Sequence, residues 1–185
     1  MVESATAATV YLADLRHTGI GYGLCGPSGE NYGNNSSMPL GISFMKAVMD
    51  RDLPEVNSRL FAYPEQLFSA LEASPPDVLM MTNYVWNERL TRHFTKVMKT
   101  LRPETLVIVG GPNIASAMER QVALFETWLH TDIYALGEGD FLATELVKCF
   151  LESGKSIARL LSNGVPSSLY RADDQIRYET PAARC

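Results

Sequence analysis

The sequence predicts a doubly wound α/β fold, in which a parallel sheet carries helices on both faces. Five short apolar runs alternate with stretches of helical periodicity, as in chains built from repeated strand–helix units. The run Val78–Thr82 (VLMMT) shows no polar–apolar alternation, which is typical of a strand buried on both faces. The connections are long enough for the crossover helices that parallel strands need. We therefore expect a flavodoxin-like or Rossmann-like sheet of five parallel strands in the order 2-1-3-4-5.

Local signals place each element of this fold. Pro39 and Pro64 stand where proline favours the start of a helix, whereas Pro75-Pro76 and Pro103 end helical stretches. The expected strands are Val10–Ala13, Val56–Tyr63, Val78–Thr82, Leu106–Val109 and Ile133–Leu136. The expected helices start at Pro39 and at Pro64, span Glu88–Leu101 and Ala115–Leu129, and run from the Gly137–Asp140 turn to Ser153.

The pattern changes after Gly154. Residues Leu169–Tyr178 are expected to form a two-stranded hairpin around Asp173 and Asp174, and a hairpin alone is only marginally stable. We expect residues 1–154 to form the sheet domain, and residues 155–185 to form a hairpin and linker toward a further domain outside this chain.

The composition argues against several classes of partner. A formal net charge of -5 offers no basic surface for nucleic acid. No apolar run approaches the roughly 18 residues of a membrane span, and the N-terminus lacks the pattern of a signal peptide, so a cytoplasmic protein is expected. Cys25, Cys149 and Cys185 are too far apart for a metal knuckle, and no CxxxCxxC motif for an iron–sulfur cluster occurs.

Four loops follow the carboxyl ends of the expected strands and should share one rim of the sheet. Doubly wound sheets bind their ligands at this rim, near the switch point between the first and third strands. The rim lacks a GxGxxG dinucleotide motif, a P-loop and the acidic cluster of a phosphorelay receiver. His17 is its one histidine, and no nucleophile–base pair is recognisable. The four loops are Asp14–Met38, Asn83–Asn87, Gly110–Asn113 and Gly137–Asp140.

The residues of the rim suit binding better than catalysis. Gly110 and Gly111 let a bulky group approach the backbone closely. Tyr84 and Trp86 either flank a flat ligand or pack on the end of the sheet. Neutral amide donors and acceptors come from Asn83, Asn87 and Asn113. We therefore expect the rim to bind and orient an amide-rich ligand, with the reactive centre carried by a cofactor.

Five motifs in order along the chain resemble those of one protein family. Together they look like the N-terminal cobalamin (B12)-binding domain of the B12-dependent radical SAM enzymes, over the range Val10–Gly154. Each motif is short, but each falls at the expected strand end or helix start. They are Pro39-Leu-Gly-Ile42, Pro76-Asp-Val78, Asn83-Tyr-Val-Trp-Asn87, Gly110-Gly-Pro112 and Gly137-Glu-Gly-Asp140.

The resemblance implies a corrinoid-binding domain of a longer enzyme. In such enzymes a radical SAM barrel of the same polypeptide carries CxxxCxxC, a 4Fe-4S cluster and S-adenosylmethionine, and most of them transfer a methyl group from methylcobalamin. The resemblance implies no catalytic residue in this segment. The cofactor contacts that it and the rim together imply are Asp14, Leu15, His17, Thr82, Asn83, Tyr84, Trp86, Asn87, Gly110, Gly111, Pro112, Asn113, Gly137, Glu138 and Gly139.

By the same resemblance, the nucleotide tail of cobalamin would pass Thr82, Asn83, Gly110 and Gly111, while Trp86 and the Gly137–Asp140 turn would border the ring or the tail. Other corrinoid domains carry a D-x-H-x-x-G motif whose histidine binds cobalt.

In this chain the stretch from Asp14 to Gly19 (DLRHTG) does not match that motif, because His17 stands one position late. His17 is therefore a weak cobalt-ligand candidate, and no other metal ligand is expected. The alternative function is a stand-alone flavodoxin-like sensor or protein-interaction domain.

Overall fold

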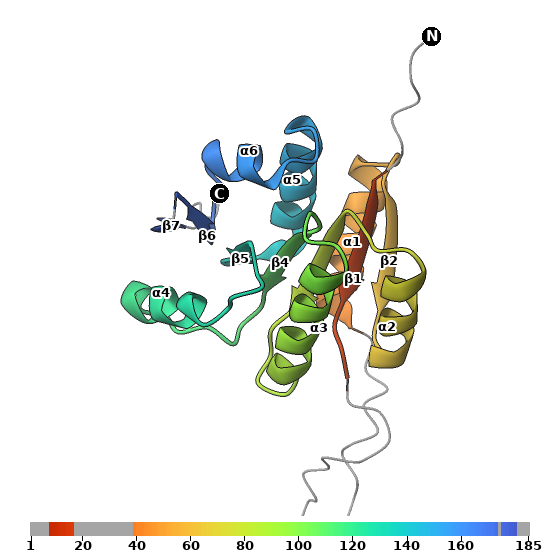
Figure 1. The fold of residues 1–185 in the computed structure, drawn as a ribbon, viewed down its shortest axis with the longest axis horizontal. Coiled ribbons are helices and arrows are strands. Elements are labelled where there is room, and N and C mark those ends of the chain that lie inside the picture. Colours follow the sequence, from red (N-terminus) through yellow and green to blue (C-terminus); the bar gives the residue numbers. More distant parts are fainter. Residues whose placement is uncertain (1–7, 17–38, 174, 181–185) are drawn as a thin grey trace, which may run out of the picture.

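The computed structural model describes residues 8–16, 39–173 and 175–180, and these form a single seven-stranded sheet with helices on both faces (Figure 1). The strands are β1 (Thr9–Ala13), β2 (Asn57–Phe61), β3 (Val78–Thr82), β4 (Leu106–Gly110), β5 (Ile133–Ala135), β6 (Ser168–Ala172) and β7 (Gln175–Glu179). The helices are α1 (Leu40–Asp52), α2 (Pro64–Ala73), α3 (Glu88–Leu101), α4 (Met118–Glu126), α5 (Gly139–Glu152) and α6 (Ile157–Ser162).

The predicted parallel sheet is confirmed. The strand order is β2-β1-β3-β4-β5-β6-β7, and the first five of these strands run parallel in the order 2-1-3-4-5. The switch point therefore lies between β1 and β3, as a doubly wound sheet requires. In-register pairing puts Thr82 of β3 beside Gly110 of β4, and Gly110 beside Ala135 of β5. These three residues form the last layer of the sheet at its carboxyl edge.

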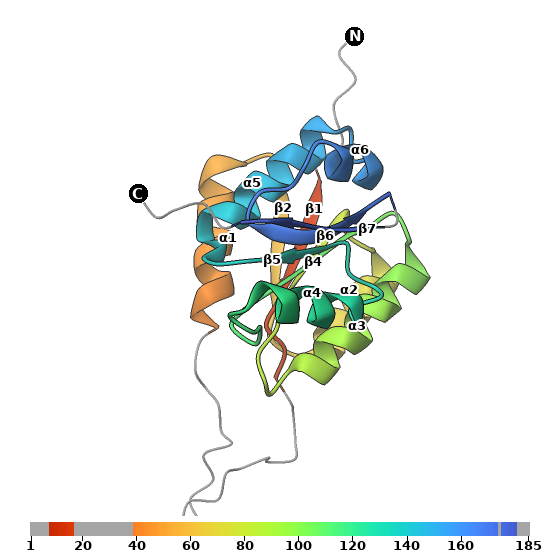
Figure 2. The same ribbon diagram turned by 90° about the vertical axis from the view of Figure 1, so that its left-hand side faces the viewer.

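The predicted C-terminal hairpin is confirmed, and it extends this sheet, which the sequence did not predict. β6 pairs antiparallel with β5, and β7 pairs antiparallel with β6 (Figure 2). The helix α6 was not predicted, because six residues are too few to show a helical period. Its N-cap is Ser156, whose hydroxyl accepts a hydrogen bond from the backbone N–H of Arg159 at 3.4 Å. The predicted boundary at residue 154 stays a prediction.

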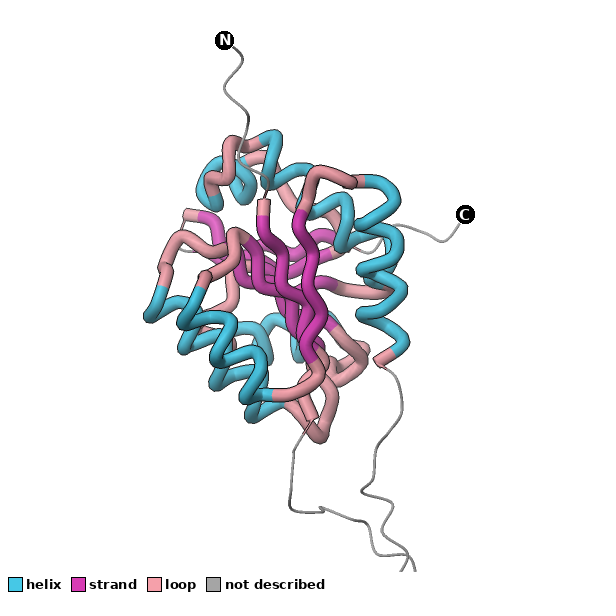
Figure 3. Tube along the Cα trace, turned by 90° about the vertical axis from the view of Figure 1, so that its right-hand side faces the viewer, coloured by secondary structure: helices cyan, strands magenta, loops and turns pink. Residues whose placement is uncertain are grey.

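The two faces of the sheet have separate hydrophobic cores. We call them the α1/α5 face, which α6 also covers, and the α2/α3/α4 face (Figure 3). Alternation along each strand divides the side chains, because successive residues point to opposite faces. Met80 and Ile108 belong to the α1/α5 core, whereas Met81 and Val109 belong to the α2/α3/α4 core. Both faces are thus apolar, which explains the uninterrupted apolar runs in the sequence.

The helices differ in small ways from the sequence prediction. Pro64 is the first residue of α2 and Glu88–Leu101 is α3, both as expected. The fourth helix begins at Met118 instead of Ala115 and ends at Glu126, before the expected Leu129. None of the helices in the described ranges is long and apolar enough to cross a membrane.

Candidate functional site

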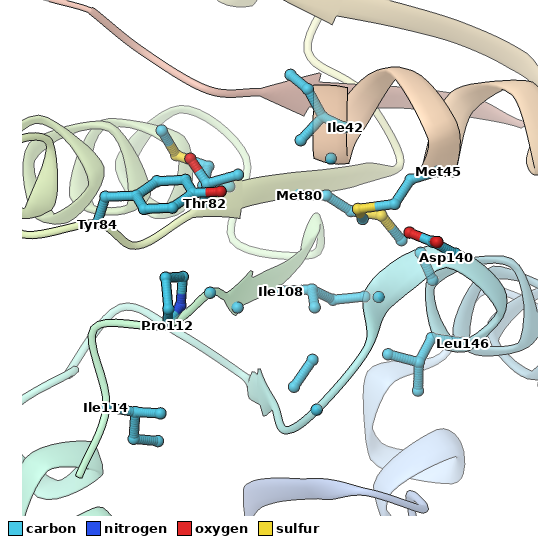
Figure 4. Close-up of a pocket in the computed structure, with 18 residues that line it drawn as sticks. Ile42, Met45, Met80, Thr82, Tyr84, Ile108, Pro112, Ile114, Asp140 and Leu146 are labelled. Atoms are coloured by element: carbon cyan, nitrogen blue, oxygen red, sulfur yellow. The ribbon is translucent and has the colours of Figure 1, made fainter. Parts of the chain in front are cut away.

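A cavity of about 380 Å³ opens at the carboxyl edge of the sheet, on the α1/α5 face. β3 and β4 form its floor, and the first turns of α1 and α5 form its walls (Figure 4). In the close-up, Met80 and Ile108 extend from adjacent strands, with Met45 of α1 and Leu146 of α5 around the same space. Cavities of this size, at this position in a doubly wound sheet, are typical ligand sites.

The floor of the cavity is hollow because the last layer of the sheet is built from small residues. Thr82, Gly110 and Ala135 follow the bulkier layer of Met80 and Ile108 on the same face. A Cβ added to Gly110 would meet only Ala135, at 3.5 Å, which is ordinary van der Waals contact. The chain itself therefore does not require glycine at position 110, and the missing side chain leaves space for a ligand.

The walls also contain small residues where the two helices begin. Gly41 of α1 and Gly139 of α5 both line the cavity. A Cβ on Gly41 would meet nothing within 4 Å, whereas a Cβ on Gly139 would lie 3.2 Å from the sulfur of Met45. Gly139 thus permits the close approach of α5 to α1, and the thioether of Met45 fills the gap between them.

On the opposite face, a buried amide network closes the same edge of the sheet. Asn83 is fully buried, and its Nδ2 donates to the hydroxyl of Tyr134 at 2.8 Å and to the carbonyl of Asn113 at 3.1 Å. The Nδ2 of Asn113 donates to Asn83 Oδ1 at 3.3 Å and to Glu88 Oε2 at 2.9 Å. Every polar atom of the Asn83 side chain is therefore used within the chain, as a buried amide requires.

Gly111 lines the cavity but is also packed tightly against this network. Its φ is +127°, and an added Cβ would lie 2.6 Å from the carbonyl oxygen and 2.9 Å from the nitrogen of Asn83. The nitrogen of Asn83 in turn donates to the Gly110 carbonyl at 2.6 Å. Only glycine can occupy position 111, because the backbone after β3 crosses directly over it.

A second polar cluster joins the ends of β1 and β3. The hydroxyl of Thr82 donates to Asp14 Oδ1 at 2.8 Å, and Nδ2 of Asn87 donates to the same oxygen at 3.1 Å and to the Thr82 hydroxyl at 3.0 Å. Asn87 Oδ1 accepts from the backbone N–H of Tyr84 at 2.8 Å. Asn87 is fully buried, so its side chain fixes the loop after β3 from inside the protein.

Two tyrosines at this edge have altered acidity. Burial raises the pKa of Tyr134 to about 12, with a smaller opposing effect of the hydrogen bond from Asn83. Burial, together with the negative charge of Asp14, also raises the pKa of Tyr84 above its usual range. Both hydroxyls are therefore neutral near pH 7 and act only as hydrogen-bonding groups.

An aromatic pair stands beside the mouth of the cavity. The rings of Tyr84 and Trp86 are stacked, with centroids 4.5 Å apart and an angle of 8° between their planes. Tyr84 lines the cavity, whereas Trp86 is 61% exposed and offers a free indole surface at the rim. An exposed flat aromatic surface of this kind suits stacking against a planar partner.

The structure brings about half of the predicted contact residues to the cavity. Those that line it are Thr82, Tyr84, Gly110, Gly111, Pro112, Gly137 and Gly139. Leu15 is fully buried in the core of the α2/α3/α4 face, and Glu138 is exposed at the N-cap of α5. Asp14, Asn83, Asn87 and Asn113 bond within the chain, and Trp86 lies at the rim. His17 and the loop that follows it lie outside the described residues.

Sequence reasoning missed the apolar lining. Apolar positions at strand or helix spacing indicate burial and do not reveal a hollow, so the sequence alone does not mark these residues as lining a cavity. The signal that could have found them is the glycine in the first turn of α1, next to the apolar stripe of that helix. The missed residues are Ile42, Met45, Met80, Met81, Ile108, Ile114, Ala135, Ala143 and Leu146. In the part of the chain that the structure describes, no group of three or more potential metal ligands occurs.

Two curated proteins are similar to part of this sequence. The cobalamin-dependent radical SAM methyltransferase TokK of Streptomyces tokunonensis is 38% identical over 72 residues, which are 39% of this chain and 10% of TokK. The 2-(S-pantetheinyl)-carbapenam-3-carboxylate methyltransferase of Streptantibioticus cattleyicolor is 33% identical over 72 residues, with the same coverage. No protein-family model matches the chain.

Solved structures of a third protein share the fold. The cobalamin-dependent S-adenosylmethionine radical enzyme OxsB, with aqua-cobalamin and S-adenosylmethionine bound, superposes with a TM-score of 0.66 at 14% identity. OxsB with aqua-cobalamin bound gives a TM-score of 0.64 at 15% identity. Each match covers 96% of this chain but only 22% or 23% of OxsB.

These comparisons confirm the resemblance that the motifs predicted. One relative in sequence, TokK, and the neighbour in fold, OxsB, are cobalamin-dependent radical SAM enzymes. The chain corresponds to less than a quarter of OxsB, and the matched stretch to a tenth of each methyltransferase.

Proposed function

We propose that this chain is the cobalamin-binding module of a longer radical SAM methyltransferase. The cavity at the carboxyl ends of β3 and β4 is the observation that carries the proposal. It lies on the ligand side of a doubly wound sheet, and its floor contains a glycine that the chain does not need for its own packing. The similarity to two methyltransferases, one of them named as cobalamin-dependent, supports this choice of ligand and reaction.

The cavity fits one part of the cofactor. A volume of about 380 Å³ is near the lower limit of small-molecule sites, so it accommodates a heterocyclic base but not a corrin macrocycle. In the proposed complex, Thr82 and Gly110 would hold the nucleotide tail, and the residues between α1 and α5 would hold its base. Trp86 and the Gly137–Asp140 turn would border the macrocycle, which is too large for the cavity.

Within this complex, the residues of the chain bind and orient. When bound, the cobalt centre supplies the methyl group that is transferred, while the barrel, the 4Fe-4S cluster and S-adenosylmethionine belong to other parts of the same polypeptide. None of the described cavity-lining residues is a histidine, so these residues provide no imidazole for cobalt. The cytoplasmic location predicted from the sequence remains a prediction.

Retention of hydroxocobalamin by the purified chain tests the proposal. We expect corrinoid absorbance to survive desalting, and we expect Gly110→Leu to abolish it, because a leucine side chain would fill the cavity. Gly110→Ala is the matched control, since its Cβ makes only ordinary contact and should preserve most binding. Circular dichroism establishes that each variant is folded. Failure of the wild-type chain to retain corrinoid would contradict the proposal.

Two further observations test whether His17 binds cobalt and whether the chain is instead a stand-alone sensor domain. A His17→Ala variant should leave the spectrum of the bound corrinoid unchanged, and a clear shift would instead make His17 a cobalt ligand. The genomic sequence following Cys185 should encode a CxxxCxxC motif. A stand-alone sensor domain would have no such motif downstream.

A further inference from the structure

We propose that the cavity selects its corrinoid by the chemistry of the lower base, accepting dimethylbenzimidazole and discriminating against adenine. This inference rests on the proposed function and adds a specificity to the same site. It follows from the distribution of polar groups along the cavity, which is uneven.

The inner part of the cavity is lined by apolar side chains. Met80 and Ile108 form its floor one layer below Thr82 and Gly110, and the helices contribute aliphatic groups above them. All of these inner residues are between 1% and 4% exposed, so their surroundings are fixed by the core. They are Ile42, Met80, Ile108, Ala143 and Leu146.

The polar groups of Thr82 and Gly110 lie one layer above the inner residues, at the carboxyl edge of the sheet, and are already engaged within the chain. The hydroxyl of Thr82 donates to Asp14 and accepts from Asn87. The carbonyl of Gly110 accepts the backbone N–H of Asn83. Tyr84 and Asp140, the other polar lining side chains, are only partly buried, and Asp140 comes from the first turn of α5, beside Met45 (Figure 4). Among the described inner residues, none has a polar side chain to meet a polar base.

This arrangement treats the two bases differently. Adenine carries an exocyclic amine and two pyrimidine nitrogens, and burying such groups without partners loses their hydrogen bonds to water. Dimethylbenzimidazole carries two methyl groups at the equivalent ring, and these gain from burial against aliphatic and thioether side chains. Each base also has one imidazole nitrogen that is not bonded to the ribose. Its burial costs both bases about the same, so it does not affect the comparison. We expect at least tenfold tighter binding of the benzimidazole form, which corresponds to about 1.4 kcal/mol.

Titration of the purified chain with three corrinoids, followed by visible absorbance, tests this inference. The ligands are hydroxocobalamin, the hydroxo cobamide whose lower base is adenine, and diaquacobinamide, which has no base. We expect hydroxocobalamin to bind at least tenfold more tightly than either of the others. Equal affinity for the two base-bearing corrinoids would overturn the selectivity, and equal affinity for cobinamide would show that the base does not occupy the cavity. Failure of all three to bind would instead contradict the proposed function.

A pair of matched variants links the selectivity to the cavity. Ala143→Ser places a hydroxyl in the inner lining, whereas Ala70→Ser makes the same change in a buried helix on the opposite face. We expect Ala143→Ser to reduce the affinity ratio of the two cobamides at least threefold and Ala70→Ser to leave it unchanged. A ratio that Ala143→Ser does not lower, in a variant with wild-type circular dichroism, would contradict the placement of the base.

Discussion

The two faces of the sheet end differently at the same edge. On the α2/α3/α4 face, the network of Asn83, Asn113 and Tyr134 fills the space up to the end of β4 and β5 with buried hydrogen bonds. On the α1/α5 face, the corresponding layer consists of Thr82 and Gly110 with open space above them. One face therefore fixes the positions of the loops, and the other face is free to receive a ligand.

The adjacent glycines Gly110 and Gly111 show what this difference means for a sequence motif. Both belong to the same GGP motif, yet glycine stands at the two positions for different reasons. Gly111 is needed by the fold, since the backbone of Asn83 crosses over it, whereas Gly110 leaves a hollow that the fold alone does not explain. A glycine-rich strand end can thus combine a structural and a ligand-binding requirement in consecutive positions.

The largest expected effect comes from substituting the structural glycine. Gly111→Ala forces a Cβ against the carbonyl and nitrogen of Asn83 at a φ of +127°, so we expect it to lower the free energy of unfolding by about 3 kcal/mol. Gly110→Ala should lower it by less than about 1 kcal/mol, since glycine-to-alanine changes in ordinary contact are small. Urea denaturation measures both. Equal losses would remove the distinction between the two positions.

The network on the α2/α3/α4 face should also make the stability of the protein fall at alkaline pH. The pKa of Tyr134 is raised by burial to about 12, from 10.0 for a free tyrosine. The folded state therefore keeps this proton where the unfolded state loses it, so the contribution is present below pH 10 and is lost between about pH 10 and 12.

Over that window we expect the free energy of unfolding to fall by about 1.4 kcal/mol per pH unit from Tyr134 alone. The measurement is the difference between the wild-type protein and Tyr134→Phe in urea denaturation at several pH values. The variant loses one buried hydrogen bond, worth about 1 kcal/mol at neutral pH, but should lack this part of the alkaline decline. Parallel pH curves would show that Tyr134 titrates normally.

The smallest expected effect concerns the cavity wall formed by α1 and α5. Gly41→Ala places a methyl group where nothing lies within 4 Å, so it should stabilise α1 by about 0.5 to 1 kcal/mol through helix propensity. Gly139→Ala on the facing helix must displace the thioether of Met45, and we expect it to gain less. Thermal or urea unfolding measures the stability of both variants. A larger gain in stability from Gly139→Ala than from Gly41→Ala would mean that α1 and α5 are not closely packed at Gly139.

Most of the fold could be predicted from the sequence because the signals are local. The uninterrupted apolar run of Val78–Thr82 identified a strand buried on both faces, and Pro64 marked the start of a helix. The place of the C-terminal hairpin could not be predicted, because pairing with β5 depends on a free sheet edge that no local pattern reveals. The helix α6 was too short to be recognised.

Only about half of the candidate site could be predicted, because the rest depends on packing between elements that are distant in the sequence. Loop residues at strand ends can be located from the strand order, so Thr82, Tyr84 and Gly110 were found. Whether a side chain faces the cavity or the opposite network depends on the alternation of the strand and on the packing of α1 against α5. That packing separates Thr82 from its neighbour Asn83, although both occupy the same strand end and both were expected to contact the ligand.

The most direct test of the account is methyl NMR of the methionines during addition of hydroxocobalamin. Met45 and Met80 line the cavity, whereas Met49 and Met98 are fully buried elsewhere, Met98 on the opposite face. An aromatic base in the cavity should shift the methyl resonances of Met45 and Met80 and leave those of Met49 and Met98 nearly unchanged. Corrinoid that is retained without shifting Met45 or Met80 would contradict the placement of the base between α1 and α5.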